Sequence, residues 1–379
     1  MRKVFYIGFY DGDMCSPRRK SESNIAGTVY MRGLIDSLKR IGYPVTVVSL
    51  SHASGAGIYH RENIVVDSME EQFFLPYAAV RLGARTAGAR TVFLALKKFI
   101  RDNVQAEDIV ISYHSLAYGD LLTKLHRKIG FTWIPEINEI YCLSIQDRRD
   151  DSLLDEELKL FQEGDGYLFA SDILAKRYSR NKPSVVLYGN YEVATKGKEA
   201  PRGRVNITYT GIINEDRGVF RIVEAMEMLP SDFDLYILGF GSQEQLEKLR
   251  GCIEKINQKL NGERVFYCGI RTGKAYSDFL GDKHIGVNLI SQQQGIADNA
   301  FPGKILSYMG HSLYVLSSAC ESIVQSRLGK AIYFCQNTPE SIAEAIRQIP
   351  IHEKCDYTDL LGGLRRDFEE ELKEMLSAF

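Results

Sequence analysis

The stretch Asn206-Ile-Thr-Tyr-Thr-Gly-Ile-Ile-Asn-Glu-Asp-Arg-Gly218 decides the fold class predicted for this chain. Its first five residues form a strand-like run, and Gly211 begins a turn that ends at a second glycine. The run from Val219 to Met228 is typical of a helix. Strand, glycine-bearing turn and helix in this order predict one unit of a parallel α/β sheet. Ligands bind at the carboxyl ends of the strands in such sheets, so this turn is a candidate site.

Two further strands of the second half run into turns of the same kind. The strand Leu235–Leu238 precedes Gly239-Phe-Gly241-Ser242 and a long helix. The strand Val265–Cys268 precedes Gly269-Ile-Arg271. Several such turns at one edge of a sheet form a cradle of backbone N–H groups, which suits a diphosphate.

The first half begins with the same order of elements. Val4–Phe9 predicts a buried strand, with Gly8 near its end. Asn24 is placed to cap a helix that contains Gly27, and Val45–Leu50 returns as a second strand. The glycines of this unit are too far apart for the G-x-G-x-x-G fingerprint, which argues against a dehydrogenase.

Length and alternation together predict two domains. A chain of 379 residues exceeds one ordinary core. The polar segment 195–204 contains two glycines and a proline and is typical of a linker. We therefore predict an α/β protein with Rossmann-like domains at 1–195 and 205–350 and a terminal segment at 351–379. That segment contains an amphipathic helix from Leu360 to Leu376.

Composition restricts the classes of function. The hydrophobic content of 45% and the charged content of 25% are those of a globular protein, and a net charge of −2 gives no reason to expect a nucleic-acid partner. The seven cysteines are scattered and form no C-x-x-C pair, which favours reduced thiols in a cytoplasm over disulfides or zinc. The chain shows no signal-peptide pattern and no apolar run of about 18 residues, so any membrane contact is expected to be peripheral.

A basic segment between Val80 and Asn103 is predicted to be one helix. It interleaves apolar residues with six cations, which are Arg81, Arg85, Arg90, Lys97, Lys98 and Arg101. One interpretation is an amphipathic helix attracted to anionic lipid, giving a peripheral membrane contact through residues 80–102. The other is the solvated face of a helix packed on the core.

A histidine follows another predicted strand. Asp108–Ser112 predicts a buried strand, and His114 comes just past its end. That position suits proton handling or a hydrogen bond to a reacting sugar, although a lone histidine is also commonly structural. Glu136 and Glu139 fall at the end of a later strand or in the turn after it. They are either site residues or caps and ion-pair partners of neighbouring elements.

The stretch Asn299-Ala-Phe-Pro-Gly-Lys-Ile-Leu-Ser307 predicts a short loop that turns into a helix. Pro302 is expected in the first turn, and Gly303 allows a ligand or a neighbouring backbone to come close. Lys304 is unusual there, because a cation in a first turn opposes the helix dipole. An anion at this point would explain it; a surface lysine paired with Asp298 is the alternative.

These features together resemble the GT-B glycosyltransferases, which have two βαβ-type halves, a linker and a terminal helix that crosses back. The second half resembles retaining glycosyltransferase family 4 in the order and spacing of its motifs. These are Gly211 with Arg217-Gly218, Gly239-x-Gly241, Phe266-x-x-Gly269, Phe301-x-x-x-x-Leu306 and Tyr314-Val-Leu-Ser-Ser. The motifs cover Asn206 to about Ile346, while the first half matches in architecture.

The resemblance implies a nucleotide-sugar in a cleft between two facing Rossmann-like domains. Arg217 would hold the diphosphate, Ile270 and Arg271 would lie beside the base, and Lys304 would point to phosphate or sugar. The implied donor-binding set is Gly211, Arg217, Gly239, Gly241, Ile270, Arg271, Asn299, Phe301, Pro302, Gly303, Lys304 and Ser307. The implied acceptor or phosphate loop contains Gly8, Asn24 and Gly27. The catalytic candidates are His114, which would face the transferred sugar, and Glu139.

The implied function is retaining transfer of a sugar from a UDP- or GDP-sugar to a glycan or lipid-linked acceptor, in polysaccharide or glycoconjugate biosynthesis. We expect a cytoplasmic protein, peripheral at the inner face of the membrane if the basic segment binds lipid. No metal or other cofactor is expected, because the Asp-x-Asp pairs are poorly placed. Asp11-Gly-Asp13 lies in the first loop, and Asp232-Phe-Asp234 lies at the amino end of a strand.

Three positions depart from the family pattern. The family usually has glutamates where this chain has Asn299 and Ser307, and an arginine where it has Ile212. Replacing a charged acceptor of a ribose hydroxyl by serine costs about 1.5–3 kcal/mol. A non-catalytic GT-B protein that acts as partner or chaperone of an active transferase is therefore an alternative. A nucleotide-sugar epimerase is another, disfavoured because its carboxylate-rich active site does not match this sequence.

Overall fold

The computed structural model describes residues 2–12, 14–19, 25–50, 57–82, 85–87, 89–144, 151–290 and 300–379. The chain forms two compact units. Unit 1 contains Met1–Asn190 and Arg365–Phe379, and unit 2 contains Tyr191–Leu364. The predicted linker 195–204 thus lies inside unit 2, where Lys198 pairs with Cys355 in an isolated antiparallel bridge.

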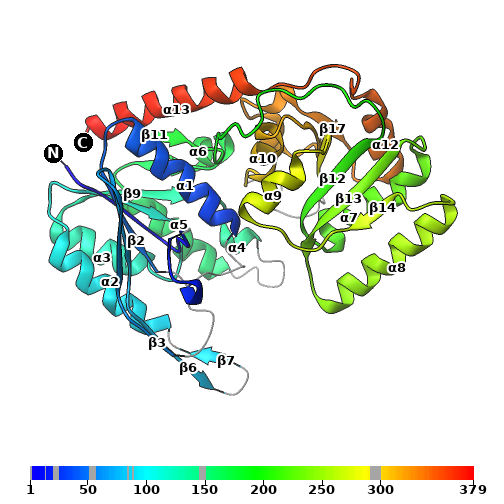
Figure 1. Ribbon diagram of the computed structural model, residues 1–379. Helices are drawn as coiled ribbons and strands as arrows, with labels where there is room; N and C mark the ends of the chain where they lie inside the picture. The colour runs from blue at the N-terminus through cyan, green and yellow to red at the C-terminus, as the bar shows by residue number, and fades with distance from the viewer. Residues whose placement is uncertain are drawn as a thin grey trace. The chain divides into compact units, whose positions relative to one another are not determined.

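Unit 1 is built on an eight-stranded sheet (Figure 1). Its order is β11-β10-β9-β8-β1-β2-β5-β4, and every neighbouring pair is parallel except β5 with β4. The strands are β1 (Val4–Gly8), β2 (Val45–Ser49), β4 (Glu62–Asp67), β5 (Glu70–Phe74), β8 (Ile109–Tyr113), β9 (Thr132–Ile137), β10 (Tyr167–Phe169) and β11 (Ser184–Val186). All five residues of β1 are buried, as expected for a strand covered on both faces.

The helices of unit 1 bury apolar stripes against this sheet. They are α1 (Ile25–Arg40), α2 (Ala89–Asn103), α3 (Gly119–Ile129), α4 (Tyr141–Ser144), α5 (Asp151–Glu163) and α6 (Asp172–Tyr178). One core joins α2 and α3 to the face of the sheet that carries Phe5 and Ile7. α3 ends where Gly130 takes a left-handed conformation, with φ 87°.

The structure corrects the prediction of a single helix from Val80 to Asn103. Residues Tyr77–Leu82 form β6, residues Arg85–Ala87 form β7, and α2 begins only at Ala89. Val80, Arg81 and Leu82 alternate with the period of a strand, and the sequence places glycines at 83 and 88 that disfavour a helix. With β3 (Gly57–Tyr59), these strands form a small antiparallel sheet in the order β3-β6-β7.

The last helix, α13 (Thr358–Ser377), contributes its residues from Arg365 onward to unit 1. Glu369 Oε1 there accepts hydrogen bonds from Arg40 Nε at 2.5 Å and from Ser37 Oγ at 3.3 Å, both on α1. The amphipathic helix that the sequence predicted at the terminus therefore returns to the N-terminal unit.

Unit 2 has a parallel six-stranded sheet in the order β14-β13-β12-β15-β16-β17. Its strands are β12 (Val205–Ile212), β13 (Phe233–Phe240), β14 (Val265–Tyr267), β15 (Ile285–Asn288), β16 (Tyr314–Ser318) and β17 (Tyr333–Cys335). Its helices are α7 (Val219–Ala225), α8 (Gln243–Lys259), α9 (Gly273–Leu280), α10 (Lys304–Gly310), α11 (Glu321–Val324) and α12 (Pro339–Gln348). Among the described helices of both units, none is long and apolar enough to cross a bilayer.

The helix after β13 shows how local sequence fixes these elements. Ser242 Oγ accepts a hydrogen bond from the backbone N–H of Gln245 at 3.2 Å, and Gln245 Oε1 accepts one from the N–H of Ser242 at 3.1 Å. This capping box satisfies two N–H groups that the first turn of α8 leaves without helical partners. Residues 239–245 therefore determine both the glycine turn and the position at which α8 begins.

Candidate functional site

The glycine turns of unit 2 meet at the carboxyl edge of its sheet. Gly211 and Gly239 pair in register at the ends of β12 and β13, and the N–H of Gly239 donates to the carbonyl of Gly269 at 2.9 Å. Gly239 has φ 158°, and a Cβ at this position would lie 1.8 Å from the carbonyl oxygen of Gly211. No other residue fits there, because the neighbouring backbone occupies the space of a side chain.

Lys304 reaches this edge from the first residue of α10. Its Nζ lies 4.7 Å from the centre of the buried Tyr209 ring, and a Cβ on Gly211 would be 3.0 Å from Nζ. Within the described parts of the chain, no carboxylate forms an ion pair with Lys304. Asp298, the partner considered for a surface lysine, lies outside the described residues.

The electrostatic state of Lys304 follows from this position. The residue as a whole is partly exposed, but protein atoms surround its ammonium group. This burial, together with the nearby charge of Arg217, lowers the pKa of Lys304 to about 7. A buried cation without a counter-charge is costly, and an anionic ligand would remove much of that cost.

Arg217 is the second cation of this edge. It ends the 3-10 turn Glu215–Arg217 that follows β12, where its N–H donates to Asn214 Oδ1 at 2.9 Å. No ion pair of its guanidinium occurs among the residues that the structure describes. Gly218 then takes φ 65°, and a Cβ there would lie 2.5 Å from Leu289 Cβ. The glycine thus allows the turn to pack closely, and Arg217 stays close enough to lower the pKa of Lys304.

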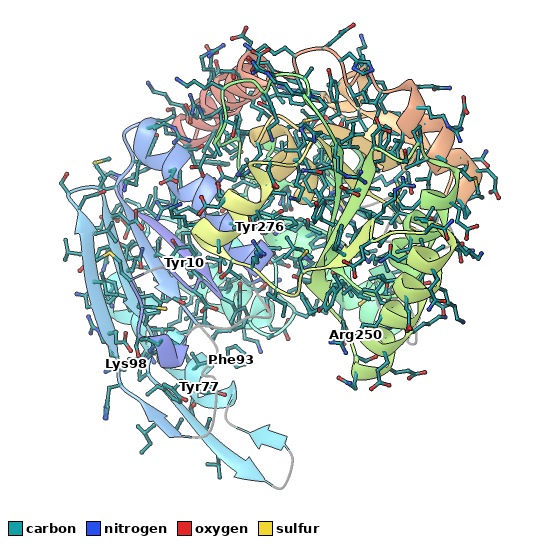
Figure 2. All side chains as sticks on the ribbon, turned by 45° about the vertical axis from the view of Figure 1, so that its right-hand side comes forward. Tyr10, Tyr77, Phe93, Lys98, Arg250 and Tyr276 are labelled. Carbon is teal, nitrogen blue, oxygen red and sulfur yellow. The ribbon has the colours of Figure 1, made fainter. Side chains whose placement is uncertain are left out.

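A group of hydroxyls lies between β12 and helices α9 and α10. Thr210 Oγ1 is 3.0 Å from the hydroxyl of Tyr308 and 3.3 Å from that of Tyr276. The Tyr276 hydroxyl also interacts with the side chain of Ser307. Ser307, which the resemblance to family 4 aligns with a glutamate, is therefore part of a neutral hydroxyl cluster. Tyr276, labelled in Figure 2, was not predicted from sequence, because only the fold brings α9 to Ser307.

Three exposed apolar side chains lie across the same edge. Ile212 pairs in register with Phe240, and their exposed fractions are 41% and 44%. Ile270 follows Gly269 on the neighbouring strand end and is 50% exposed. We call this row the apolar ladder. Arg271, the other residue predicted beside a base, lies with its guanidinium carbon 5.0 Å from the centre of the Phe279 ring.

The start of α10 differs in detail from the prediction. Pro302 lies two residues before the helix, with its carbonyl accepting from the N–H of Ile305 at 3.0 Å, and Gly303 is the residue at the cap. Phe301 is buried. Asn299 lies outside the described residues.

In unit 1, Gly8 of the predicted acceptor or phosphate loop allows close packing. A Cβ on Gly8 would lie 2.8 Å from Met31 Sδ and 3.1 Å from Tyr113 Cβ, so this glycine lets α1 and β8 approach β1. Gly27 is buried on α1. The N–H of Asp11 in the loop donates to Thr28 Oγ1 at 3.3 Å. Asn24 lies outside the described residues.

His114 is buried just after β8. Its Nδ1 is 3.1 Å from the carbonyl of Glu139, and its ring stacks on Tyr141 with centroids 4.6 Å apart. Burial lowers the pKa of His114 to about 4, so the ring is neutral at pH 7. Its Nε2 lies 3.3 Å from Glu157 Oε1 without the geometry of a hydrogen bond. His114 is thus suited to hydrogen bonding and not to carrying a charge.

The carboxylates near His114 have different roles. Glu157, which the sequence did not single out, accepts from the N–H groups of Tyr141 and Cys142 at 2.7 and 2.9 Å and so caps α4. Glu136 is fully buried on β9, where burial raises its pKa to about 7 and Tyr6 donates to its Oε2 at 2.5 Å. Glu139 contributes its carbonyl to His114.

One of the two Asp-x-Asp pairs lies at the amino end of a strand, as predicted from the sequence. Asp234 Oδ1 accepts a hydrogen bond of 2.5 Å from Arg204 at the amino end of β13, opposite to the glycine turns. Asp13 lies outside the described residues. Within the described ranges, no group of three His, Cys, Asp or Glu side chains is arranged to hold a metal ion.

No protein-family model matches the sequence, and no curated protein matches it. Solved structures do match over the whole chain. A trehalose-6-phosphate synthase aligns with a TM-score of 0.69 at 11% identity, covering 100% of this chain and 99% of its own. The Anabaena protein HepE, in complex with UDP and glucose, gives 0.66 at 10% identity, with 100% of both chains covered. A sucrose-phosphate synthase from Thermosynechococcus elongatus gives 0.65 at 15% identity, with 100% and 94% covered.

The chain has the GT-B fold. The predicted α/β class with two Rossmann-like parallel-sheet domains and a returning C-terminal helix is therefore confirmed. At sequence identities of 10–15%, the structural similarity shows the fold and does not show the function. The resemblance to family 4 stays a prediction that rests on the motifs of unit 2.

Proposed function

We propose that this protein transfers a sugar from a nucleoside-diphosphate-sugar to a glycan or lipid-linked acceptor. The observation that carries the proposal is the pair Lys304 and Arg217, two cations without carboxylate partners at the glycine-lined edge of unit 2. Two neighbours on the same fold support it, since one was solved with UDP and glucose and another with UDP-2-fluoro glucose.

The proposed chemistry is stabilisation of a leaving diphosphate without a metal ion. Charge develops on the phosphate oxygens as the sugar bond breaks, and fixed cations in a partly dehydrated site stabilise that charge strongly. Lys304 gains a counter-charge when the donor binds, so its pKa rises and it becomes fully protonated. A side chain at Gly211 would lie 3.0 Å from Lys304 Nζ, so this glycine keeps the space beside that nitrogen free for a phosphate.

The remaining groups of unit 2 fit the other parts of a donor. The apolar ladder offers a flat contact for a base, and the hydroxyls of Ser307 and Tyr276 can hydrogen-bond to sugar hydroxyls. In unit 1 the proposal assigns His114 and Glu139 to the transferred sugar and the region of Gly8 and Gly27 to the acceptor. We also propose retention of configuration and a cytoplasmic location.

Calorimetric titration with UDP-, GDP- and other nucleoside-diphosphate sugars tests the donor class. We expect one base to bind with at least tenfold preference, and NMR of the product should show the anomeric configuration of the donor. Failure of every donor to bind would refute the proposal. Inversion would refute retention only.

A non-catalytic role is the second candidate. Family 4 donor sites usually have charged residues at two positions where this chain has Ser307, in a neutral hydroxyl cluster, and the apolar Ile212. The charged contacts that those residues would make with a donor are absent here. A partner or chaperone of this kind would bind donor and neither transfer the sugar nor hydrolyse the donor. Detection of slow donor hydrolysis, abolished by Lys304→Met, would exclude it.

A further inference from the structure

One end of unit 1 combines exposed aliphatic side chains with cations. The large apolar side chains with the greatest exposure in the described parts of the chain include Ile58 at 74%, Leu94 at 68% and Val80 at 60%. They lie on β3, α2 and β6, and Figure 1 shows β3, β6 and β7 projecting beyond the rest of unit 1. Figure 2 places Tyr77, Phe93 and Lys98 together at this end.

These side chains lie on elements that pack against one another. Ile58 pairs with Ala78 across β3 and β6, and Val80 lies two residues further along the same face of β6. Thr91 Oγ1 on α2 is 3.1 Å from the N–H of Ala78, so the helix is fixed beside this strand. Leu94 follows Thr91 by one helical turn.

Cations continue the face along α2. Lys97, Lys98 and Arg101 are exposed and follow Leu94 at the spacing of one helix side, while Val92, Leu96, Phe99 and Ile100 are buried in the core. We call Ile58, Val80, Leu94, Lys97, Lys98 and Arg101 the tip face.

The charge of this region is opposite to that of the chain as a whole. The elements β3, β6, β7 and α2 contain six Arg and Lys residues and one acid, Asp102, which lies 3.4 Å from Lys98. The complete chain has a net charge of −2. Concentration of positive charge around protruding aliphatic residues is the pattern of a surface that lies in a lipid interface.

We infer that the tip face docks unit 1 on an anionic lipid surface. Ile58, Val80 and Leu94 would enter the region between head groups and acyl chains, and Lys97, Lys98 and Arg101 would contact lipid phosphates. Protein interfaces are typically rich in aromatic residues and poor in lysine, whereas this face carries two lysines and exposes aliphatic groups. This inference is independent of the proposed sugar transfer.

Flotation of the full-length protein with vesicles tests it. We expect binding to phosphatidylcholine vesicles that contain phosphatidylglycerol, weakening as salt is raised, and little binding to phosphatidylcholine alone. The double variant Lys97→Glu/Lys98→Glu should lose at least about 25-fold in partitioning, from roughly fivefold for each lysine. The matched control is Lys124→Glu/Lys128→Glu, because these lysines are exposed on the neighbouring helix α3 and give the same change of net charge.

A second pair of variants tests the apolar part. Ile58→Ser/Leu94→Ser should weaken vesicle binding and make the remainder more sensitive to salt, while donor affinity stays unchanged. The inference would be overturned if the Lys97/Lys98 and Lys124/Lys128 variants lost vesicle binding equally. It would also be overturned if the wild type bound neutral and anionic vesicles equally, or bound no vesicles. A dimer that depends on Ile58 and Leu94 would assign the face to a second copy of the chain and would also overturn it.

Discussion

The two units differ in whether carboxylates pair with their partly buried cations. In unit 1, Arg32 donates to both carboxylate oxygens of Glu70, at 2.7 and 2.9 Å, and Lys39 donates to the same carboxylate at 2.9 Å. In unit 2, Lys304 and Arg217 lie close together with no carboxylate paired to either in the described residues. The first arrangement is complete within the fold, and the second is complete only with an anion.

The directions of the pKa shifts express this difference. Burial alone would raise the pKa of Glu70, but hydrogen bonds from Arg32, Gln72 and Lys39 lower it, so the carboxylate stays charged. Burial and the charge of Arg217 both lower the pKa of Lys304. A buried charge that the protein itself satisfies indicates structure, and one that it leaves unsatisfied indicates a ligand site. Stability and donor binding should therefore respond to different substitutions.

The largest effect is expected on stability, at the paired cations. Glu70→Gln removes the buried charge that Arg32 and Lys39 share and should reduce the free energy of unfolding by about 3 kcal/mol, because a hydrogen bond to a charged group contributes about 1.5–3 kcal/mol and both cations lose such an acceptor. Urea unfolding measures this. The control Glu71→Gln, at a partly exposed neighbour, should change it by about 0.5 kcal/mol or less. Equal effects of the two variants would remove the basis of the comparison.

The next effect is on donor binding, at the unpaired cation. Lys304→Met keeps most of the side-chain volume and should lower donor affinity by about 10- to 100-fold, which corresponds to about 1.5–3 kcal/mol for a hydrogen bond to a charged group. Its stability should not fall, since the substitution removes a poorly solvated charge. Calorimetric titration and urea unfolding of the same sample separate the two results. Lys330→Met, at an exposed lysine, is the control; a loss of stability with unchanged affinity would make Lys304 structural.

The sequence predicted the parts of the site that local rules determine. Gly239 is required by an approach of adjacent strand ends, and such turns follow buried strands in a recognisable order. Lys304 was found because its sign is wrong for a first turn. The order of strand and glycine turn, and the charge of a first-turn residue, are both properties of a few consecutive residues.

The parts that the sequence did not predict depend on contacts between distant segments. Phe240 joins Ile212 only through strand register, and Tyr276 reaches Ser307 only through helix packing. Residues 80–82 and 85–87 were wrongly predicted as helix, because interleaved cations and apolar residues fit both periods over so short a length. Antiparallel pairing of β6 with β3 and with β7 decides in favour of strands.

A smaller effect is expected from pH. Lys304 in the free protein has its pKa near 7, and a bound diphosphate should raise it, so the complex holds more protons than the free protein above pH 7. Donor affinity should therefore fall as pH rises, by about fivefold between pH 7 and pH 8 if the bound lysine stays protonated. A UDP-sugar has no phosphate group that titrates in this range, which makes it the appropriate ligand. Titrations in buffers of different ionisation enthalpy should show proton uptake in the wild type and none in Lys304→Met; uptake in both would place the proton on another group.

The smallest effect is expected at the apolar ladder, where the contact is not charged. Phe240→Ala removes a ring that is 44% exposed at the carboxyl edge and should weaken donor binding by about fivefold, since stacking of aromatic groups contributes about 1 kcal/mol. Met228→Ala is the control, an exposed apolar residue near the amino end of β13 that should leave affinity unchanged. Affinity for a free nucleoside diphosphate should fall by the same factor as affinity for the complete donor, because the ladder is proposed to contact the base. A loss of affinity confined to the complete donor would show that Phe240 contacts the sugar and not the base. Lys304 and Arg217 would then be the residues of this edge that define the nucleoside-diphosphate site.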